Sequence, residues 1–397
     1  MMAGSPRDDD ATPTTSRGGP VAAVRADPQL AVLALAAIVS YLAFWPLRYY
    51  DVWNSYAPWL RHIVRNGPLE AFSAPFGDYT PPYYYLLTIV SPARALLTDN
   101  QTVKLASVIA TLALAFAVAR LLATLGAARP AKLALWFLLV PGIMFNAVLS
   151  ASADALWAAP SVMALVMAIE RRHRAMLIWC GVAAAIKAQA MFVAPFFLAL
   201  VIARRVPFGH WLLAPLAALA LYVPALLCGW PLGDLLTVYL RQAGFFDDLS
   251  LNAPNILAIV QLWPGHDPVT VSRVFSIAAV VATIVLIAVL SRRTFERRLL
   301  VAAAALTILI VVGLLPRMHE RYFYLADVLM FAYAASVATR RAWIDAALVL
   351  LGSTLGIAAH LLEQRALAAV GAVAMTAAVV RLIRTLSETR GEGPTGG

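Results

Sequence analysis

Apolar residues recur along the chain in blocks that are long enough to form membrane-crossing helices. Runs of about 17 to 25 such residues can cross the roughly 30 Å hydrocarbon core of a bilayer as helices. Short polar clusters separate the blocks. The predicted fold class is therefore all-α, a polytopic transmembrane helical bundle of about 12 spans. These spans are predicted at residues 30–46, 103–124, 132–149, 154–169, 175–189, 190–203, 208–228, 272–290, 299–315, 322–339, 343–361 and 366–382.

The apolar segment 81–97 is predicted not to cross the membrane. Pro81 and Pro82 open it, and three tyrosines, which favour the membrane interface, follow directly. Pro92 and Arg94 then interrupt its second half. We expect this segment to lie along the surface.

The segment 175–203 is long for a single span and carries Lys187 and Gln189 near its middle. A charged side chain at the centre of a bilayer costs about 2.5 to 3.5 kcal/mol on insertion scales. We therefore predict two short helices joined by a turn at the far face. That turn would leave Lys187 and Gln189 in water.

Composition agrees with a membrane protein. Of the 397 residues, 62% are hydrophobic and 13% charged, and the mean hydropathy is +0.78. Soluble domains carry about a quarter charged residues. The net charge of +10 comes from short clusters between apolar blocks rather than from one continuous basic face. We therefore expect no nucleic-acid partner.

The clusters of arginine and lysine predict the topology, because positively charged loops stay in the cytosol. This places a cytosolic N-terminus and two long external loops at 47–102 and 229–271. The working hypothesis for the location is a bacterial plasma membrane. Each external loop is expected to contain an amphipathic surface helix, such as Trp53–Arg65. The predicted organisation is a disordered tail at 1–28, a catalytic membrane module at 29–228, the second external loop at 229–271, a C-terminal membrane module at 272–385 and a disordered tail at 386–397.

Polar and ionisable groups in or beside the spans gather on the predicted external face. Charged groups at membrane depth are costly and usually line a cavity or bind a ligand. A random scatter would place about half of them on the cytosolic side. The candidate site residues are Asp51, Asp78, Tyr79, Asp154, Lys187, Gln189, Arg317, His319, Glu320 and Arg321.

These groups suit group transfer from a lipid phosphate. Asp51, at the membrane boundary, can act as a general base that takes the proton of an attacking hydroxyl. Cations hold the leaving phosphate, and the available ones are Lys187, Arg317, His319 and Arg321. The substrate contacts are expected from Asp78, Tyr79, Asp154, Gln189 and Glu320. Because no metal-ligand cluster is evident and the few acids of the predicted external loops form no tight Asp-x-Asp motif, we expect catalysis without a metal and without a cofactor.

Structural roles compete with these functions. Asp51 can be an ordinary helix-end charge, Asp78 can shape a turn, and Asp154 can cap its helix. The His-Glu-Arg run can be a solvated turn, and Lys187 can extend to the interface. Asp327, inside a span, is a candidate buried partner for one of the cations.

Several blocks, taken in order, resemble the GT-C superfamily of multi-span glycosyltransferases, and most closely the bacterial relatives of the GPI-anchor mannosyltransferases. The resemblance covers about residues 30 to 340. Each block alone is weak, while the ordered set with the block at Met318–Phe323 is fairly specific. The blocks are Asp51, Gly77–Tyr85, Ser152–Trp157, Ile186–Gln189, Leu251–Asn255 and Pro316–Asp327.

The resemblance implies a fold with juxtamembrane helices in the first external loop. It also implies an inverting transfer of mannose from a polyprenyl-phosphate donor, with Asp51 as base and with His319 and Arg321 on the donor phosphate. The acceptor would be a glycolipid, a polysaccharide or a protein. Relatives often have Trp-Gly-Gln where this chain has Leu149–Ser152, a departure that affects acceptor contacts more than donor chemistry.

Three alternatives remain open from the sequence. A transporter or flippase of a lipid-linked substrate also explains intramembrane charge, but it predicts an inverted repeat and polar groups through the bilayer. A non-catalytic membrane subunit would bind a lipid or a partner. Within the enzyme class, a pentose such as arabinofuranose is the other candidate sugar.

Overall fold

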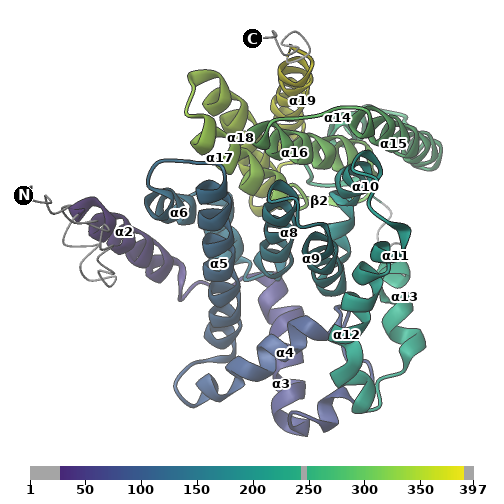
Figure 1. Cartoon of the computed structure of the whole chain (residues 1–397). Coiled ribbons are helices and arrows are strands. Elements are labelled where there is room, and N and C mark those ends of the chain that lie inside the picture. The colour runs from purple at the N-terminus through teal and green to yellow at the C-terminus, as the bar shows by residue number, and fades with distance from the viewer. Residues whose placement is uncertain (1–26, 243–247, 389–397) are drawn as a thin grey trace, which may run out of the picture.

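The structure, a computed structural model, describes residues 27–242 and 248–388 and is built almost entirely of helices (Figure 1). The all-α fold class is therefore confirmed. Six helical segments among the described residues are long and apolar enough to cross a membrane, which makes the chain a helical membrane protein. They are α5 (Asp99–Thr124), α11 (Phe208–Trp211) with α12 (Leu213–Leu227), α15 (Pro268–Ser291), α16 (Arg297–Leu314), α18 (Arg340–Leu361) and α19 (Arg365–Glu388).

The remaining predicted spans are also helical, but they are bent or short. One bent pair, with an angle of 65° between its halves, counts as a seventh candidate span if it is taken as one. It consists of α6 (Pro130–Leu138) followed by α7 (Pro141–Met144) and η4 (Phe145–Leu149). The short apolar helices are α2 (Pro28–Phe44), α8 (Asp154–Ile169), α9 (His173–Ile186), α10 (Ala194–Ala203) and α17 (Tyr324–Val337). At 1.5 Å per residue these reach at most about 26 Å, so the count of 12 spans stays a prediction.

The first external loop folds as short helices against one end of the bundle. Its elements are η1 (Val52–Tyr56), α3 (Ala57–Asn66), η2 (Glu70–Phe72), α4 (Pro81–Val90) and η3 (Ser91–Ala95). The surface helix predicted at Trp53–Arg65 corresponds to η1 and α3, with Trp59, Leu60 and Ile63 buried on one side. Helix α4 rises only about 15 Å and cannot cross a bilayer, as expected.

Helices α5, α8 and α9 stand side by side, with α3 and α4 at one end of them (Figure 1). Helices α16, α17 and α18 pack in succession, and α15 lies beside α10 and α16. The second external loop contributes α13 (Leu232–Gln242) and α14 (Ile256–Val260). This arrangement brings both external loops near the turn between α16 and α17.

The segment 175–203 does break into two short helices, α9 and α10, at the predicted position. Lys187 adopts an extended backbone conformation, and the 3-10 turn η5 (Ala188–Phe192) follows. The expectation that Lys187 and Gln189 are wet is wrong, because only 4% and 6% of their surfaces are exposed. Neighbouring elements cover the turn, and Lys187 Nζ donates a hydrogen bond to Asp154 at 2.6 Å, whereas Gln189 Oε1 has no hydrogen-bond partner among the described residues.

Among the described residues, the helical fold also contains two short strands of two residues each. Strand β1 (Ser250–Leu251) pairs in parallel with β2 (Met318–His319). Two backbone hydrogen bonds extend the pairing, from Arg317 N to Leu249 O at 2.9 Å and from Glu320 N to Leu251 O at 3.1 Å. The second external loop therefore holds the backbone of the His-Glu-Arg turn in place.

The chain ends differ slightly from the predicted tails. Asp27 caps α2, and α19 extends to Glu388, so residues 27–28 and 386–388 belong to structured elements. The rest of the two predicted tails lies outside the described residues.

Helices α9 and α12 approach closely at Gly181. A Cβ atom there would lie 2.1 Å from the backbone oxygen of Ala214, a contact that only a shift of the helices can relieve. Gly181→Ala is expected to destabilise the protein by about 1 to 3 kcal/mol, as overpacking does. Thermal unfolding in detergent measures this.

Gly313→Ala is the matched control for Gly181→Ala. Gly313 also lies inside a helix, but a Cβ atom there meets nothing within 4 Å. Alanine at this position should leave stability unchanged or raise it by up to about 1 kcal/mol. An equal loss of stability in Gly181→Ala and Gly313→Ala would contradict a close contact between α9 and α12 at Gly181.

Candidate functional site

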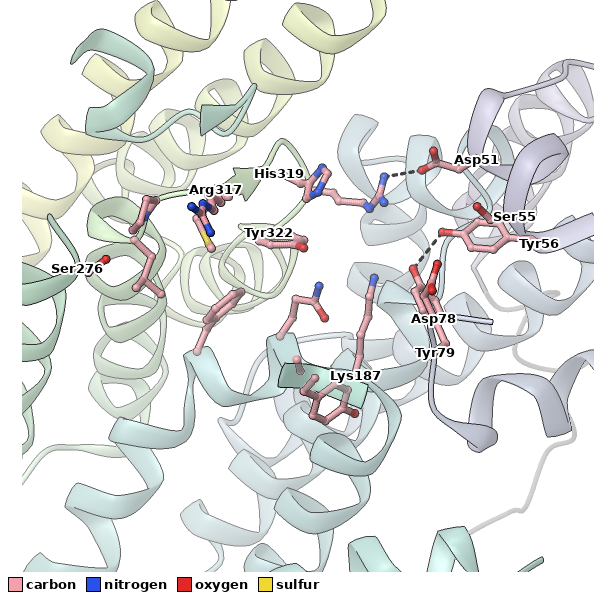
Figure 2. Close-up of a pocket in the computed structure, with 18 of the residues that line it drawn as sticks. Asp51, Ser55, Tyr56, Asp78, Tyr79, Lys187, Ser276, Arg317, His319 and Tyr322 are labelled. Atoms are coloured by element: carbon pink, nitrogen blue, oxygen red, sulfur yellow. Dashed lines mark hydrogen bonds and ion pairs between the residues drawn. The ribbon is translucent and has the colours of Figure 1, made fainter. Parts of the chain in front are cut away.

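One cavity of about 620 Å³ collects most of the predicted site residues. Such a volume lies in the range of small-molecule sites, about 300 to 1,000 Å³. Both external loops, η5, α15 and the turn between α16 and α17 contribute to its wall (Figure 2). The predicted residues that line it are Asp51, Asp78, Tyr79, Lys187, Gln189, Arg317, His319 and Arg321.

Asp51 stands at the start of η1, directly after the segment that leaves α2. Lys104, a fully buried lysine of α5, fixes that segment by donating hydrogen bonds to the carbonyls of Phe44, Trp45 and Leu47 at 2.6–3.0 Å. Short π-helical turns such as η1 occur frequently at functional sites. Lys104 was not among the predicted site residues, although a lone lysine in an apolar helix indicates a buried structural or functional role.

Arg321 connects three carboxylates. Its Nη1 donates to Asp51 Oδ2 at 2.9 Å and to Glu320 Oε1 at 3.1 Å, and its Nε lies 3.7 Å from Asp154 Oδ2. The Oδ1 atom of Asp51 has no hydrogen bond to the described part of the chain. The ion pair therefore orients Asp51 through one oxygen and leaves the other for a ligand.

Asp154 lies behind the cavity wall and holds Lys187. The carboxylate is 1% exposed and accepts hydrogen bonds from Lys187 Nζ at 2.6 Å, Ser152 Oγ at 2.7 Å and Asn146 Nδ2 at 2.9 Å. It makes no capping hydrogen bond to the start of α8, so the capping alternative is wrong. It does not line the cavity either, so its substrate contact stays a prediction, while the structure shows that it holds Lys187.

The Lys187 ammonium group also lies against an aromatic wall. It is 5.1 Å from the centre of the Tyr79 ring, close enough for a cation–π interaction. The Tyr79 hydroxyl is 3.1 Å from that of Tyr56, while its backbone N–H donates to Tyr84 at 2.9 Å. Figure 2 shows Asp78, Tyr79 and Lys187 on the same side of the cavity.

Glu320 does not line the cavity and is 1% exposed, so its substrate contact stays a prediction. Burial alone would raise its pKa, but the charge of Arg321 and a hydrogen bond from His319 lower it from 4.5 to about 2. Burial opposes the charge of Arg321, but the neighbouring Glu320, Tyr56 and Asp51 raise its pKa well above its usual value. Glu320 therefore acts as a buried counter-charge beneath Arg321.

The lowered pKa of Glu320 predicts a loss of stability in acid. Its ionised form contributes fully above the unfolded-state pKa of 4.5, and the contribution disappears as pH falls to about 2. We expect the difference in thermal midpoint between wild type and Glu320→Gln to be constant above pH 4.5 and to shrink below it. A difference that is independent of pH over this interval would contradict the ionic role.

Asp327 is not the partner of a cation. Its Oδ1 accepts a hydrogen bond from Ser353 Oγ at 2.8 Å, and no ion pair links it to another described residue. It lies on α17, facing α18 rather than the cavity. The expected ion pair is therefore wrong, because the neighbouring helix supplies a hydroxyl.

Several cavity residues were missed in the sequence. Tyr239, Phe192, Ser272 and Ser276 line the same space, together with Tyr322, whose ring centre is 5.2 Å from that of His319. The two serines are four residues apart on the apolar helix α15, a spacing that places them on one face. This spacing was a usable signal, whereas nothing in the sequence distinguished Phe192 or Tyr239.

No group of three or more His, Cys, Asp or Glu side chains within residues 27–242 and 248–388 is arranged to hold a metal ion. Metal-independent chemistry nevertheless remains a prediction. A scan against protein-family models gives no match, and a search of curated proteins gives none either. The function proposed below for this chain therefore rests on its own residues and on the resemblance of its sequence blocks to the GT-C superfamily.

Proposed function

We propose that the chain is an inverting glycosyltransferase that moves a sugar, mannose in the first instance, from a polyprenyl-phosphate donor to an acceptor hydroxyl. The observation that carries this proposal is the single cavity shared by Asp51 and the groups Lys187, Arg317, His319 and Arg321. A general base and phosphate-binding cations are the two requirements of this chemistry.

In the proposed step, the acceptor hydroxyl attacks the anomeric carbon from the face opposite the phosphate. A carbon–oxygen bond forms as the bond to the phosphate oxygen breaks, and the bonding electrons leave with the polyprenyl phosphate. Asp51 Oδ1 takes the hydroxyl proton, while Arg321 holds Oδ2 in place. The cations stabilise the negative charge of the leaving phosphate, which needs no added proton.

The groups lining the cavity differ in their access to a phosphate. Lys187 and Arg321 are ion-paired with protein carboxylates, yet each retains further N–H donors. Arg317 and His319 stand on the opposite side of the cavity from Lys187 (Figure 2). We assign the phosphate contacts to Arg317, His319, Lys187 and Arg321 together, because all four line the cavity.

The two ends of the same helices support a proposal for the side of the membrane. Helices α9 and α16 each end at the cavity and begin beside arginine-rich loops, at His173 and Arg297. Because positive loops stay in the cytosol, we propose an extracytoplasmic site within a 12-span, GT-C-like bundle. The apolar outer face of α15, with Ile277 and Val281 exposed, would then meet lipid beside Ser272 and Ser276, where the donor can enter.

Incubation of the purified protein with polyprenyl-phosphate mannose and membrane acceptors tests the proposal. We expect mannose in the product and release of polyprenyl phosphate, with mass analysis identifying sugar and acceptor. A parallel reaction with the arabinofuranose donor tests the alternative sugar. Movement of intact donor across vesicles without transfer would instead support a flippase and would reject the enzyme.

A further inference from the structure

A second cation-rich site lies at the other end of the helices that form the candidate site. Two adjoining cavities of about 390 and 240 Å³ share the lining residues Arg171, Arg204, Phe295 and Leu300. Arg293 and Arg297 each line one of them. Helix α16 has 18 residues, so its two ends are about 27 Å apart, close to the thickness of a bilayer core.

These arginines lack compensating acids. None of Arg171, Arg204, Arg293 and Arg297 forms an ion pair with a carboxylate of the described residues. The acidic lining residue Glu170 is engaged by Arg120 at 3.4 Å and Arg172 at 3.6 Å. Like charges held together without a counter-charge are costly, and an anionic ligand would relieve that cost.

An unpaired guanidinium donor also favours an anionic ligand. Arg293 Nε is a buried donor without a hydrogen-bond partner among the described residues. The buried Nδ1 of His173 has none there either, and both residues line the larger cavity. Helices α9 and α16 begin beside these cavities, at His173 and Arg297, and neither has a side-chain hydrogen bond that caps its first turn. Unpaired N–H groups at a helix start favour an anion, so two helix ends reinforce the arginines.

Apolar residues share the lining with these charges. Leu200, Phe295 and Leu300 border the larger cavity next to Arg204 and Arg293. An amphiphile matches such a surface, because its phosphate meets the arginines while its glycerol and first methylenes meet the apolar groups. We propose that these two cavities bind the phosphate of an anionic phospholipid headgroup on the face opposite the candidate active site.

The test uses two matched double variants of the full chain. Arg171→Gln with Arg297→Gln removes two lining arginines, whereas Arg292→Gln with Arg298→Gln removes two nearby exposed arginines that line neither cavity and do not pair with Glu170. Both variants lose the same net charge and keep the hydrogen bond from Arg204 to the Ala168 carbonyl. A comparison of their thermal midpoints without anionic lipid checks folding.

Binding is measured as the rise in thermal midpoint when phosphatidylglycerol is titrated into phosphatidylcholine nanodiscs at high salt, which screens non-specific attraction. We expect the lining variant to bind phosphatidylglycerol about tenfold or more weakly, as the loss of charge-assisted hydrogen bonds predicts. The control variant should bind like wild type. Equal weakening in both variants, or no stabilisation by phosphatidylglycerol in wild type, would overturn the proposal.

A detergent arm with inorganic phosphate distinguishes the source of the phosphate. Weak stabilisation by inorganic phosphate beside strong stabilisation by phosphatidylglycerol supports the lipid. Stabilisation by inorganic phosphate alone, lost in the lining variant, keeps an anion site but rejects the lipid headgroup. None of these outcomes depends on sugar transfer. The lipid site can therefore be supported or rejected independently of the proposed function.

Discussion

Replacement of Asp51 by asparagine is expected to lower sugar transfer by about 100- to 10,000-fold, the usual contribution of a general base. Asparagine keeps the shape of the side chain and can still accept a hydrogen bond from Arg321, so the fold should be retained. It cannot take a proton at neutral pH. The rate of product formation from polyprenyl-phosphate mannose measures the effect, with donor binding measured separately by titration.

Asp99→Asn is the matched control for Asp51→Asn. Asp99 is also a carboxylate of the external region that pairs with an arginine, Arg94, at 2.6 Å, but it does not line the cavity. Its variant should retain near wild-type transfer. Normal turnover by Asp51→Asn would reject the assigned base, and loss of donor binding without a change in the chemical step would reassign Asp51 to binding.

Asp154→Ala is expected to be the most destabilising single substitution in the site, by about 3 to 5 kcal/mol. Asp154 is the closest acceptor of Lys187, and both side chains are buried. Without the carboxylate, Lys187, which is only 4% exposed, keeps its charge but loses its closest counter-charge. Thermal or denaturant unfolding in detergent measures the loss.

A double-mutant cycle separates the ion pair from simple packing. Lys187→Met in the Asp154→Ala background removes the stranded charge and should restore part of the lost stability. Glu388→Gln, which breaks the exposed pair with Arg341 at 2.8 Å, serves as the control and should leave the thermal midpoint almost unchanged. Strictly additive effects at positions 154 and 187 would show that the pair does not couple them.

The sequence alone determined the helical membrane class and the position of nearly every helix. Apolar blocks must be covered by lipid or protein, and only helices satisfy their own backbone hydrogen bonds in that environment. The break at Lys187 was also predictable, since a charge within an apolar run disfavours an unbroken span. Eight of the ten proposed site residues line one cavity, and their shared placement on one face came from the charge pattern of the loops.

Only the tertiary structure decided which of these polar groups line the cavity and which lie behind its wall and pair with them. Asp154 and Glu320 differ little in sequence context from Asp51, yet they are buried counter-charges because α8 and the β1–β2 pairing carry them behind the wall. The contribution of α15 to the cavity likewise depends on packing between segments far apart in the chain. Periodicity and charge are local properties of a sequence, whereas the partner of a buried charge is set by whichever distant side chain the fold places within hydrogen-bonding distance.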